Sequence, residues 1–538
     1  MKAFAYPEFD NRLRRRSSLE FASCLLKKTR DGVAKKPSDA GLLRTANHWC
    51  RPMVFRTMAD PLWRLIVAFC ILPVLLLATL SVVSGAWSDA LGAQCVLACG
   101  AFVSLRLLGQ YPMLNPVHAV VPLFQWWFGF GPAVCAVFWS WKGDSTRADS
   151  YLTGGMMPTL IVALGLPIYA SAARWVLRHW KGPQLTEIAP DGPTYDMGTL
   201  ARLAAVAVLA GLIVQVLNLF GLRAYATVNY LGGQVTERWW LVPFAEAGRL
   251  FDFLIVFACS LLATPNLRGR AVTRWVMLGV AIAAVAQAVT SGSKGLLVLP
   301  VFYFLVAFAN WRRRLPWLVL VAALFGYLSI VEPFVGTMRS QAEKVRATTT
   351  SEREEIFSQG WRDFQIGEQP NRDVNVESLF RGIYPLAKKV ADQSSLLDGP
   401  WKGQSLRDGF SALLPRALFP YKADSNMGNL FARELGEAES SNYVQNVAIT
   451  IPFEVVGNYG WLAGLLSFAI IGVGWASFVA FVLTVPRMTT HPFTPYLVAF
   501  VMGIESSVGQ FGNQLKMLLM PLTLLYLVCQ MRRKRSSV

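Results

Sequence analysis

Apolar residues along this chain come in blocks of about twenty, separated by shorter polar connections, rather than in the narrow stripes of amphipathic helices. A helix of about twenty apolar residues crosses the hydrocarbon core of a bilayer and satisfies its own backbone hydrogen bonds there. The pattern therefore predicts an all-α polytopic membrane protein with about twelve transmembrane helices. Their predicted spans are 62–84, 88–108, 117–140, 151–176, 199–221, 240–263, 272–290, 294–310, 316–332, 450–484, 493–509 and 514–530.

Lysine and arginine favour every second connection between these blocks, as the positive-inside rule requires of cytoplasmic loops. The basic connections are a polar N-terminal arm, the region around Arg106, and the segments RWVLRHWK, NLRGRAVTR, NWRRRLP, VPRMTTHP and RRKRSSV. We therefore expect both termini in the cytoplasm, the opposite connections in the periplasm, and a bacterial inner membrane between them. The predicted parts are a basic arm (1–58), transmembrane helices 1–9 (59–332), a periplasmic loop (333–449), helices 10–12 (450–530) and a basic tail (531–538).

The long loop between the ninth and tenth spans is where we expect function. Two of its segments, VESLFRGIYPLAKKVADQ and SLRDGFSALLPRALF, have the helical spacing of apolar residues. We expect a mostly helical loop whose helices lie against the membrane surface and roof a cavity. Tryptophans such as Trp401 and Trp461 are expected mostly in interfacial belts, with sugar-stacking surfaces as the alternative.

Charge and composition exclude several other classes of function. The formal net charge is +18, yet the basic residues lie mainly beside the apolar blocks, so topology explains them better than a nucleic-acid partner does. None of the eight cysteines falls in the loop or in a CxxC pair, so we infer no disulfide framework and no cysteine metal site. All four histidines are predicted at the cytoplasmic side, which argues against a zinc site in the loop. We therefore expect no metal, no cofactor, and a carboxylate as general base.

Ionisable residues inside membrane spans are costly, and they usually mark a pathway or a reaction centre. A charged residue at the end of a span has a second explanation, because its side chain can reach toward the headgroups. Their convergence from separate helices predicts a shared site near the outer face. Five of them lie at the outer ends of different predicted spans: Lys294, Glu332, Glu454, Glu505 and Lys516.

The segment SGSKG, residues 291–295, interrupts an apolar run at the predicted outer boundary. Small residues let the backbone bend and expose amide N–H groups, and Lys294 adds a cation next to Ser293, which is the arrangement of an anion cradle. A tight turn between two helices has the same composition. The GxxxxGK[ST] pattern of an ATP site is missing here.

These features resemble the bacterial O-antigen and oligosaccharide repeat-unit polymerases, the Wzy-type family of C-type glycosyltransferases. The resemblance covers the architecture of most of residues 60–530, and it is sharpest at TSGSKG, LLPRALFPYKADSNMGNLFA and FEVVGNYGWLAG. Some family members carry an arginine followed by ten residues and a glycine in the loop. Here the interval from Arg416 to Gly428 is one residue longer.

The resemblance implies a metal-independent polymerase that transfers a growing glycan from undecaprenyl pyrophosphate to the next lipid-linked repeat unit, for an O-antigen, capsule or exopolysaccharide. It implies lipid-linked oligosaccharides as substrates, and a copolymerase that regulates chain length fits as a partner beside membrane lipids. Cations and backbone amides can stabilise the departing pyrophosphate. The candidates for that role are Lys294, Arg416, Lys422, Arg381 and Arg339.

Glu454 is the candidate that accepts a proton from the acceptor or orients it, with Asp424 as the second candidate. Glu454 is also explained as an N-terminal helix charge favoured by the helix dipole. Asn458 either binds a sugar hydroxyl or packs helices together, and Ser293 and Glu332 complete the candidate residues. Two other activities stay open. A ligase that moves finished glycan would share the donor site, whereas a transporter or flippase would place its binding groups near the midplane.

Overall fold

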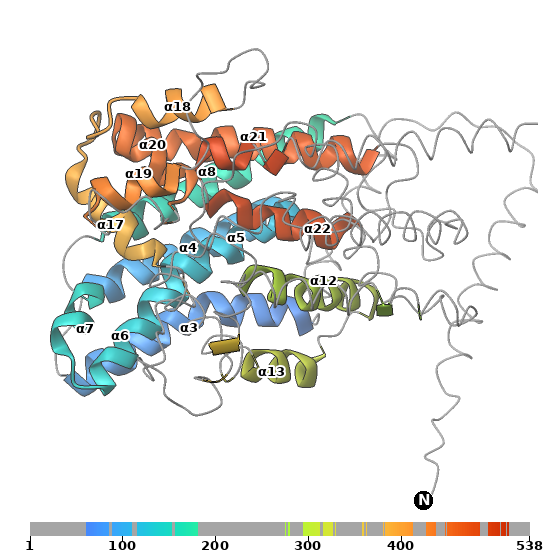
Figure 1. Ribbon diagram of the computed structural model, residues 1–538, viewed down its shortest axis with the longest axis horizontal. Coiled ribbons are helices and arrows are strands. Elements are labelled where there is room, and N and C mark those ends of the chain that lie inside the picture. Colours follow the sequence, from blue (N-terminus) through green and yellow to red (C-terminus); the bar gives the residue numbers. More distant parts are fainter. Residues whose placement is uncertain are drawn as a thin grey trace, which may run out of the picture. The chain divides into compact units, whose positions relative to one another are not determined.

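The computed structural model describes residues 61–84, 89–109, 116–152, 156–180, 294–312, 316–326, 382–412, 427–436, 449–484, 493–505 and 507–512, with 275, 278–279, 329, 358–359, 362, 380, 447 and 514–515 (Figure 1). The chain divides into two compact units, Met1–Asp60 and Pro61–Val538, and every described residue belongs to the second unit.

The described residues form helices and no strand, which confirms the predicted all-α class. The helices of the first part are α3 (Pro61–Ser84), α4 (Asp89–Leu108), α5 (Pro116–Gln125), the π-helix η1 (Trp126–Phe130), α6 (Gly131–Trp141), α7 (Ser145–Leu152), α8 (Met157–His179), α12 (Lys294–Arg312) and α13 (Trp317–Gly326). Those of the second part are α17 (Ile383–Gln393), α18 (Gln404–Ala412), α19 (Met427–Glu434), α20 (Ile451–Tyr459), α21 (Trp461–Thr484), α22 (Phe493–Phe500) and the 3-10 helix η5 (Val501–Glu505).

Four segments in the described part of the chain are long and apolar enough to cross a membrane: Asp89–Leu108, Pro116–Trp141, Ser145–His179 apart from 153–155, and Trp461–Val482. They coincide with the predicted spans 88–108, 117–140 and 151–176 and with most of 450–484. α3 and α12 likewise fall on the predicted spans 62–84 and 294–310. The predicted spans 199–221 and 240–263 lie outside the described residues, so the total of about twelve stays a prediction. The periplasmic side of the loop also stays a prediction.

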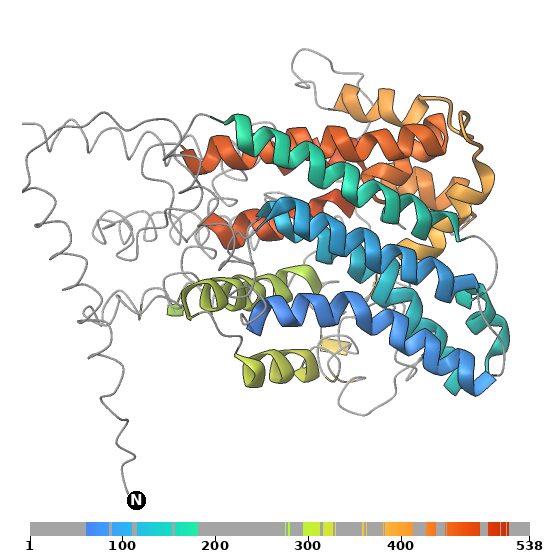
Figure 2. The ribbon, with the colours of Figure 1, turned by 180° about the vertical axis from the view of Figure 1, so that it is seen from behind.

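Helix α8 packs against both α4 and α21, and small residues allow the close approach (Figures 1 and 2). Gly100 of α4 faces the carbonyl of Ala163, and the ring of Phe468 lies against Gly165. A side chain at either glycine would occupy space that a neighbouring helix fills. This is the small-residue packing typical of helices in membranes, where contact distance rather than hydrophobic burial drives association.

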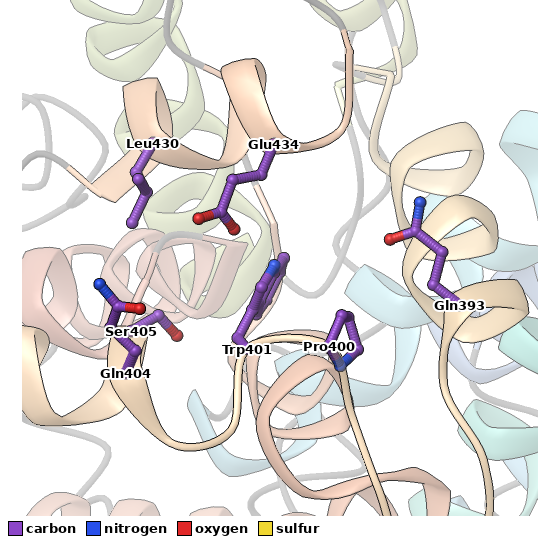
Figure 3. Close-up of a pocket in the computed structure, with 7 residues that line it drawn as sticks. All are labelled: Gln393, Pro400, Trp401, Gln404, Ser405, Leu430 and Glu434. Atoms are coloured by element: carbon purple, nitrogen blue, oxygen red, sulfur yellow. The ribbon is translucent and has the colours of Figure 1, made fainter.

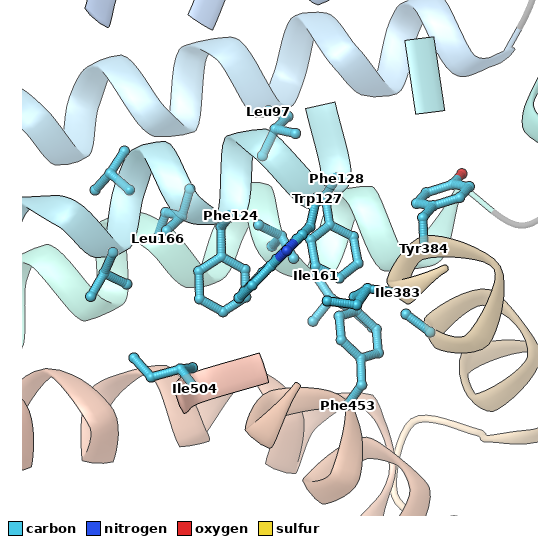
Figure 4. Packing of buried hydrophobic residues seen from close by; sticks show 14 of the residues in the cluster. Leu97, Phe124, Trp127, Phe128, Ile161, Leu166, Ile383, Tyr384, Phe453 and Ile504 are labelled. Carbon is cyan, nitrogen blue, oxygen red and sulfur yellow. The ribbon is translucent and has the colours of Figure 1, made fainter. Parts of the chain in front are cut away.

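Aromatic residues of the π-helix and its flanks connect the first part of the fold to the second (Figure 4). Phe128 stacks on Phe453 of α20 at 5.1 Å between ring centroids and meets Tyr384 of α17 edge-to-face at 6.2 Å. Phe124 contacts Phe468 of α21 at 5.2 Å. These buried rings fix α20 in place, and with it the residue that follows Phe453, which is Glu454.

The helical spacing predicted in the long loop is confirmed for α17 and for α18. The apolar face of α17, which includes Ile383, Leu386 and Val390, is buried in the protein core, because α17 packs against α8 and α20. It therefore differs from a helix that rests its apolar face on lipid. The turn after α17 does expose apolar residues, since Leu397 is 71% exposed.

The predicted span 450–484 is two helices rather than one, and Gly460 separates them. Gly460 has a φ of +85°, in the left-handed region that favours glycine. A Cβ atom there would lie 2.6 Å from the backbone nitrogen of Asp398. The first amides of α21 are consequently paired outside their own helix, because Trp461 N–H donates to Ser395 O and Leu462 N–H donates to Leu396 O, each at 3.0 Å.

We predict that Gly460→Ala destabilises the protein by about 1–3 kcal/mol, because it adds backbone strain and a contact with the turn. The thermal unfolding midpoint of the purified protein should fall by several degrees. Gly474→Ala is the matched control, since Gly474 lies within α21 and a Cβ there has nothing within 4 Å. Equal midpoints for the two variants would contradict the role of Gly460.

Candidate functional site

The turn between α17 and α18 is tied to α20 by backbone and side-chain hydrogen bonds. Ser394 Oγ donates to Val456 O at 3.3 Å, and Trp401 N–H donates to Gly457 O at 2.8 Å. Lys402 and Gly403 then take left-handed conformations, with φ of 47° and 81°, which turn the chain into α18. As a result the first turn of α18, and Ser405 within it, lies against α20.

A buried carboxyl group forms the centre of the candidate site. Glu454 is fully buried, and each of its two oxygens accepts one hydrogen bond from a different part of the chain. Ser405 Oγ of α18 donates to Oε1 at 3.1 Å, and the backbone N–H of Val508 donates to Oε2 at 2.6 Å. Glu454 lies in the first turn of α20, where the helix dipole favours a negative charge, but its carboxyl oxygens pair with two other elements.

Asn458 orients the hydroxyl of Ser405. Its Nδ2 donates to Ser405 Oγ at 2.7 Å and to the carbonyl oxygen of Glu454 at 2.6 Å. Because Ser405 Oγ accepts this bond, its own hydrogen is free to point at Glu454. The buried Oδ1 of Asn458 has no partner among the described residues. The Asn458 side chain therefore does more than pack between helices, because its amino group holds the Ser405 hydroxyl in a defined orientation.

Ser405 also lies in the wall of a pocket of about 250 Å³ (Figure 3). The other described residues of the wall come from the end of α17, the turn, α18 and α19: Gln393, Pro400, Trp401, Gln404, Leu430 and Glu434. Trp401 is 8% exposed and stacks on Phe431 of α19 at 4.7 Å. It is therefore a fixed wall of the pocket, not a belt residue in contact with lipid.

Burial raises the pKa of the Glu454 carboxyl to about 7, although the hydrogen bonds from Val508 N–H and Ser405 act in the opposite direction. Glu454 belongs to α20, which has nine residues and lies outside the four segments long enough to cross a membrane. Burial also raises the pKa of Glu434, and the neighbouring Arg433 opposes that shift. A carboxyl group with a pKa near 7 can accept or release a proton at neutral pH, as a general base must.

Only some of the predicted site residues fall in the described part of the chain. Glu454 and Asn458 are brought together with Ser405, while Lys294 begins α12 and Glu505 ends η5, three residues before Val508. The side chains of Lys294 and Glu505 lie outside the description. The remaining candidates lie outside the described residues altogether: Ser293, Glu332, Arg339, Arg381, Arg416, Lys422, Asp424 and Lys516. Among the described residues no three His, Cys, Asp or Glu side chains are grouped to hold a metal ion.

Sequence reasoning missed the residues that surround Glu454. Ser405, Gln404 and Gln393 are ordinary polar residues of a polar loop, and nothing in their spacing distinguishes them from solvated positions. The donor from Val508 is a backbone amide, which no side-chain pattern can reveal. The helical spacing of apolar residues in VESLFRGIYPLAKKVADQ and SLRDGFSALLPRALF was the signal that this part of the loop is folded.

Comparison of the chain with protein-family models, with curated proteins and with solved structures finds no match.

We predict that raising the pH lowers the stability of the protein through Glu454. The folded state holds this proton more tightly than the unfolded state does, because burial raises the pKa from 4.5 to about 7. The resulting contribution is complete below pH 4.5, is lost as pH rises through about 7, and is on the order of 3 kcal/mol. Thermal unfolding midpoints at pH 5 and pH 8 should therefore differ more for the wild type than for Glu454→Gln. The same difference in both proteins would contradict this assignment.

Proposed function

We propose that this protein is a polymerase of lipid-linked oligosaccharide repeat units, a metal-independent glycosyltransferase that acts at the periplasmic face of a bacterial inner membrane. One observation carries the proposal: a buried carboxyl group with a pKa near 7 lies directly behind a serine hydroxyl in the wall of a pocket. Glu454, which the sequence already favours as the proton acceptor, is that group. The apolar helices support the membrane setting.

The arrangement supports proton removal through Ser405, which lines the pocket with 1% of its surface exposed, because Glu454 has no exposed surface. The acceptor hydroxyl gives its proton to Ser405 Oγ while Ser405 gives its own proton to Glu454 Oε1, along the 3.1 Å hydrogen bond. The acceptor oxygen bonds to the anomeric carbon of the donor glycan. The bond from that carbon to the pyrophosphate oxygen breaks, and the lipid pyrophosphate leaves with the electron pair. Asn458 keeps the serine oriented for the transfer.

The leaving pyrophosphate requires positive charge, and the predicted cations are separate from the proton acceptor. Lys294, Arg416, Lys422, Arg381 and Arg339 are the candidates for stabilising it. Fixed cations and amides aimed at a developing charge stabilise a transition state without a metal. Because arginine can bind an anion with two parallel hydrogen bonds, the arginines also give the pyrophosphate a defined orientation.

Genetic complementation tests this proposal. Deletion of the gene should leave the surface glycan with a single repeat unit in place of a ladder, and the wild-type gene should restore the ladder. Glu454→Gln keeps the size of the side chain but cannot accept the proton, so we expect polymer to fall about a hundredfold or more. Asp392→Asn is the control, since Asp392 is an exposed carboxylate of α17 outside the pocket wall. A complete loss of surface glycan with trapped cytoplasmic intermediates would indicate a flippase, and free lipid-linked long chains would indicate a ligase.

A second prediction concerns the orientation of the pocket in the membrane. Leu397 is exposed in the turn beside the pocket residues Pro400 and Trp401, so a cysteine there is accessible. Leu397→Cys should react with a membrane-impermeant maleimide when only the outer membrane is permeabilised. The parent chain with its eight native cysteines gives the background labelling. Labelling that requires lysis of the inner membrane would place the pocket in the cytosol and overturn the proposed function.

A further inference from the structure

We infer that the pocket between α17, α18 and α19 is a binding site for one uncharged sugar ring. The assignment of this ring to the acceptor glycan rests on the proposed function, whereas its binding does not. Three exposed residues of the wall carry hydrogen-bonding side chains, namely the amides of Gln393 and Gln404 and the carboxyl group of Glu434. The hydroxyl of Ser405 is 1% exposed, is already paired with Asn458 and Glu454, and has one lone pair left to accept a hydrogen bond. Amides and hydroxyls both donate and accept, which is what a ligand made of hydroxyl groups needs.

The charges of the wall argue against pyrophosphate at this position. Among the described residues that line the pocket there is no lysine, arginine or histidine, and there is one carboxyl group, Glu434. Among these described residues an anionic ligand would be repelled by that carboxylate and would meet no cation. In Figure 3 the carboxyl group of Glu434 points from α19 toward Trp401, so this negative charge lies within the hollow.

Size and rigidity favour a single ring. The described wall surrounds about 250 Å³, less than the roughly 300–1,000 Å³ typical of sites for drug-sized ligands, which suits one sugar ring. Trp401 is held by its stack on Phe431 and by contact of its ring with Gly457. Gln393 stands on the opposite side of Trp401 from Gln404 and Ser405 (Figure 3).

The pocket is also joined to the proton acceptor. Ser405 lies in the wall and donates to Glu454, so a sugar hydroxyl that contacts Ser405 is one hydrogen bond away from the buried carboxyl group. Glu434 and the two glutamines would then position the ring so that the hydroxyl which reacts is the one that faces Ser405. These residues are positioning residues, and they would select which hydroxyl is extended.

Saturation-transfer NMR on the full-length protein tests the inference. The protein should be held in nanodiscs of phosphatidylethanolamine and phosphatidylglycerol, because alkyl-glycoside detergents carry sugar rings that would compete. The probes are the methyl glycosides of glucose, galactose and N-acetylglucosamine. We expect saturation transfer to at least one probe, and we expect it to fall at least fivefold in Gln404→Ala and in Glu434→Ala. Asp392→Asn is the control and should retain the signal.

Three results would overturn the inference: no transfer to any probe, equal transfer in the wild type and the pocket variants, or displacement of the probe by inorganic pyrophosphate. If the thermal midpoint shows that one of these variants fails to fold, Gln393→Ala replaces it, because Gln393 is an exposed residue of the pocket wall. The outcome is distinguishable from that of the proposed function. Sugar binding in a protein whose deletion leaves the glycan ladder intact would retain the pocket and reject the polymerase. Loss of sugar binding in Gln404→Ala and Glu434→Ala together with a normal ladder would retain the binding site and reject its assignment to the acceptor glycan. No sugar binding in the wild type, combined with loss of the ladder on deletion, would retain the polymerase and reject the pocket.

Discussion

The two hydrogen bonds to the carboxyl group of Glu454 hold together parts of the chain that lie far apart in sequence. Ser405 comes from the turn of α18 and Val508 from the segment after η5, while Glu454 itself belongs to α20. A buried carboxylate costs several kcal/mol unless its oxygens are paired. The position of α18 is consequently not free to vary, because moving it away would leave one oxygen of a buried acid without a donor. The same requirement that stabilises the fold therefore sets the distance between the pocket wall and the acid.

Close backbone contacts make this arrangement possible. α18 crosses the segment 507–512 where Gly409 meets Gly509, and a Cβ atom at Gly409 would lie 3.0 Å from the nitrogen of Gly509. Within α20, Gly457 leaves room for the ring of Trp401. A larger residue at these points would push α18 or the tryptophan outward, and Ser405 would lose contact with Glu454. Gly457 of FEVVGNYGWLAG thus allows a neighbouring side chain to approach closely, as Gly100 allows α4 to approach α8.

Much of the fold follows from the length of the apolar blocks, and much of the site does not. Blocks such as 88–108 and 117–140 have one stable solution in lipid, a helix, so their positions are predictable. The break within 450–484 was missed, because the residues after Gly460 continue the apolar run and no sequence pattern shows that the backbone of Asp398 approaches this glycine. Glu454 was identifiable as a costly charge. Its partners were not identifiable. Ser405 becomes a neighbour only when α18 packs against α20, and the other donor is the backbone N–H of Val508, which no side-chain pattern reveals.

The separation of the acid from the pocket bears on the choice between a polymerase and a ligase. Both activities would release the same lipid pyrophosphate, so the cations that stabilise it cannot distinguish them. The difference lies in the acceptor, which is a sugar of a lipid-linked repeat unit in one case and another molecule in the other. Under the proposed function the acceptor presents its hydroxyl at Ser405, since Glu454 has no surface of its own. Under the proposed function, the residues that decide between the two activities are those around Ser405. The amides of Gln393 and Gln404 suit a sugar ring that is not yet part of the polymer, and Glu434 adds one carboxyl group.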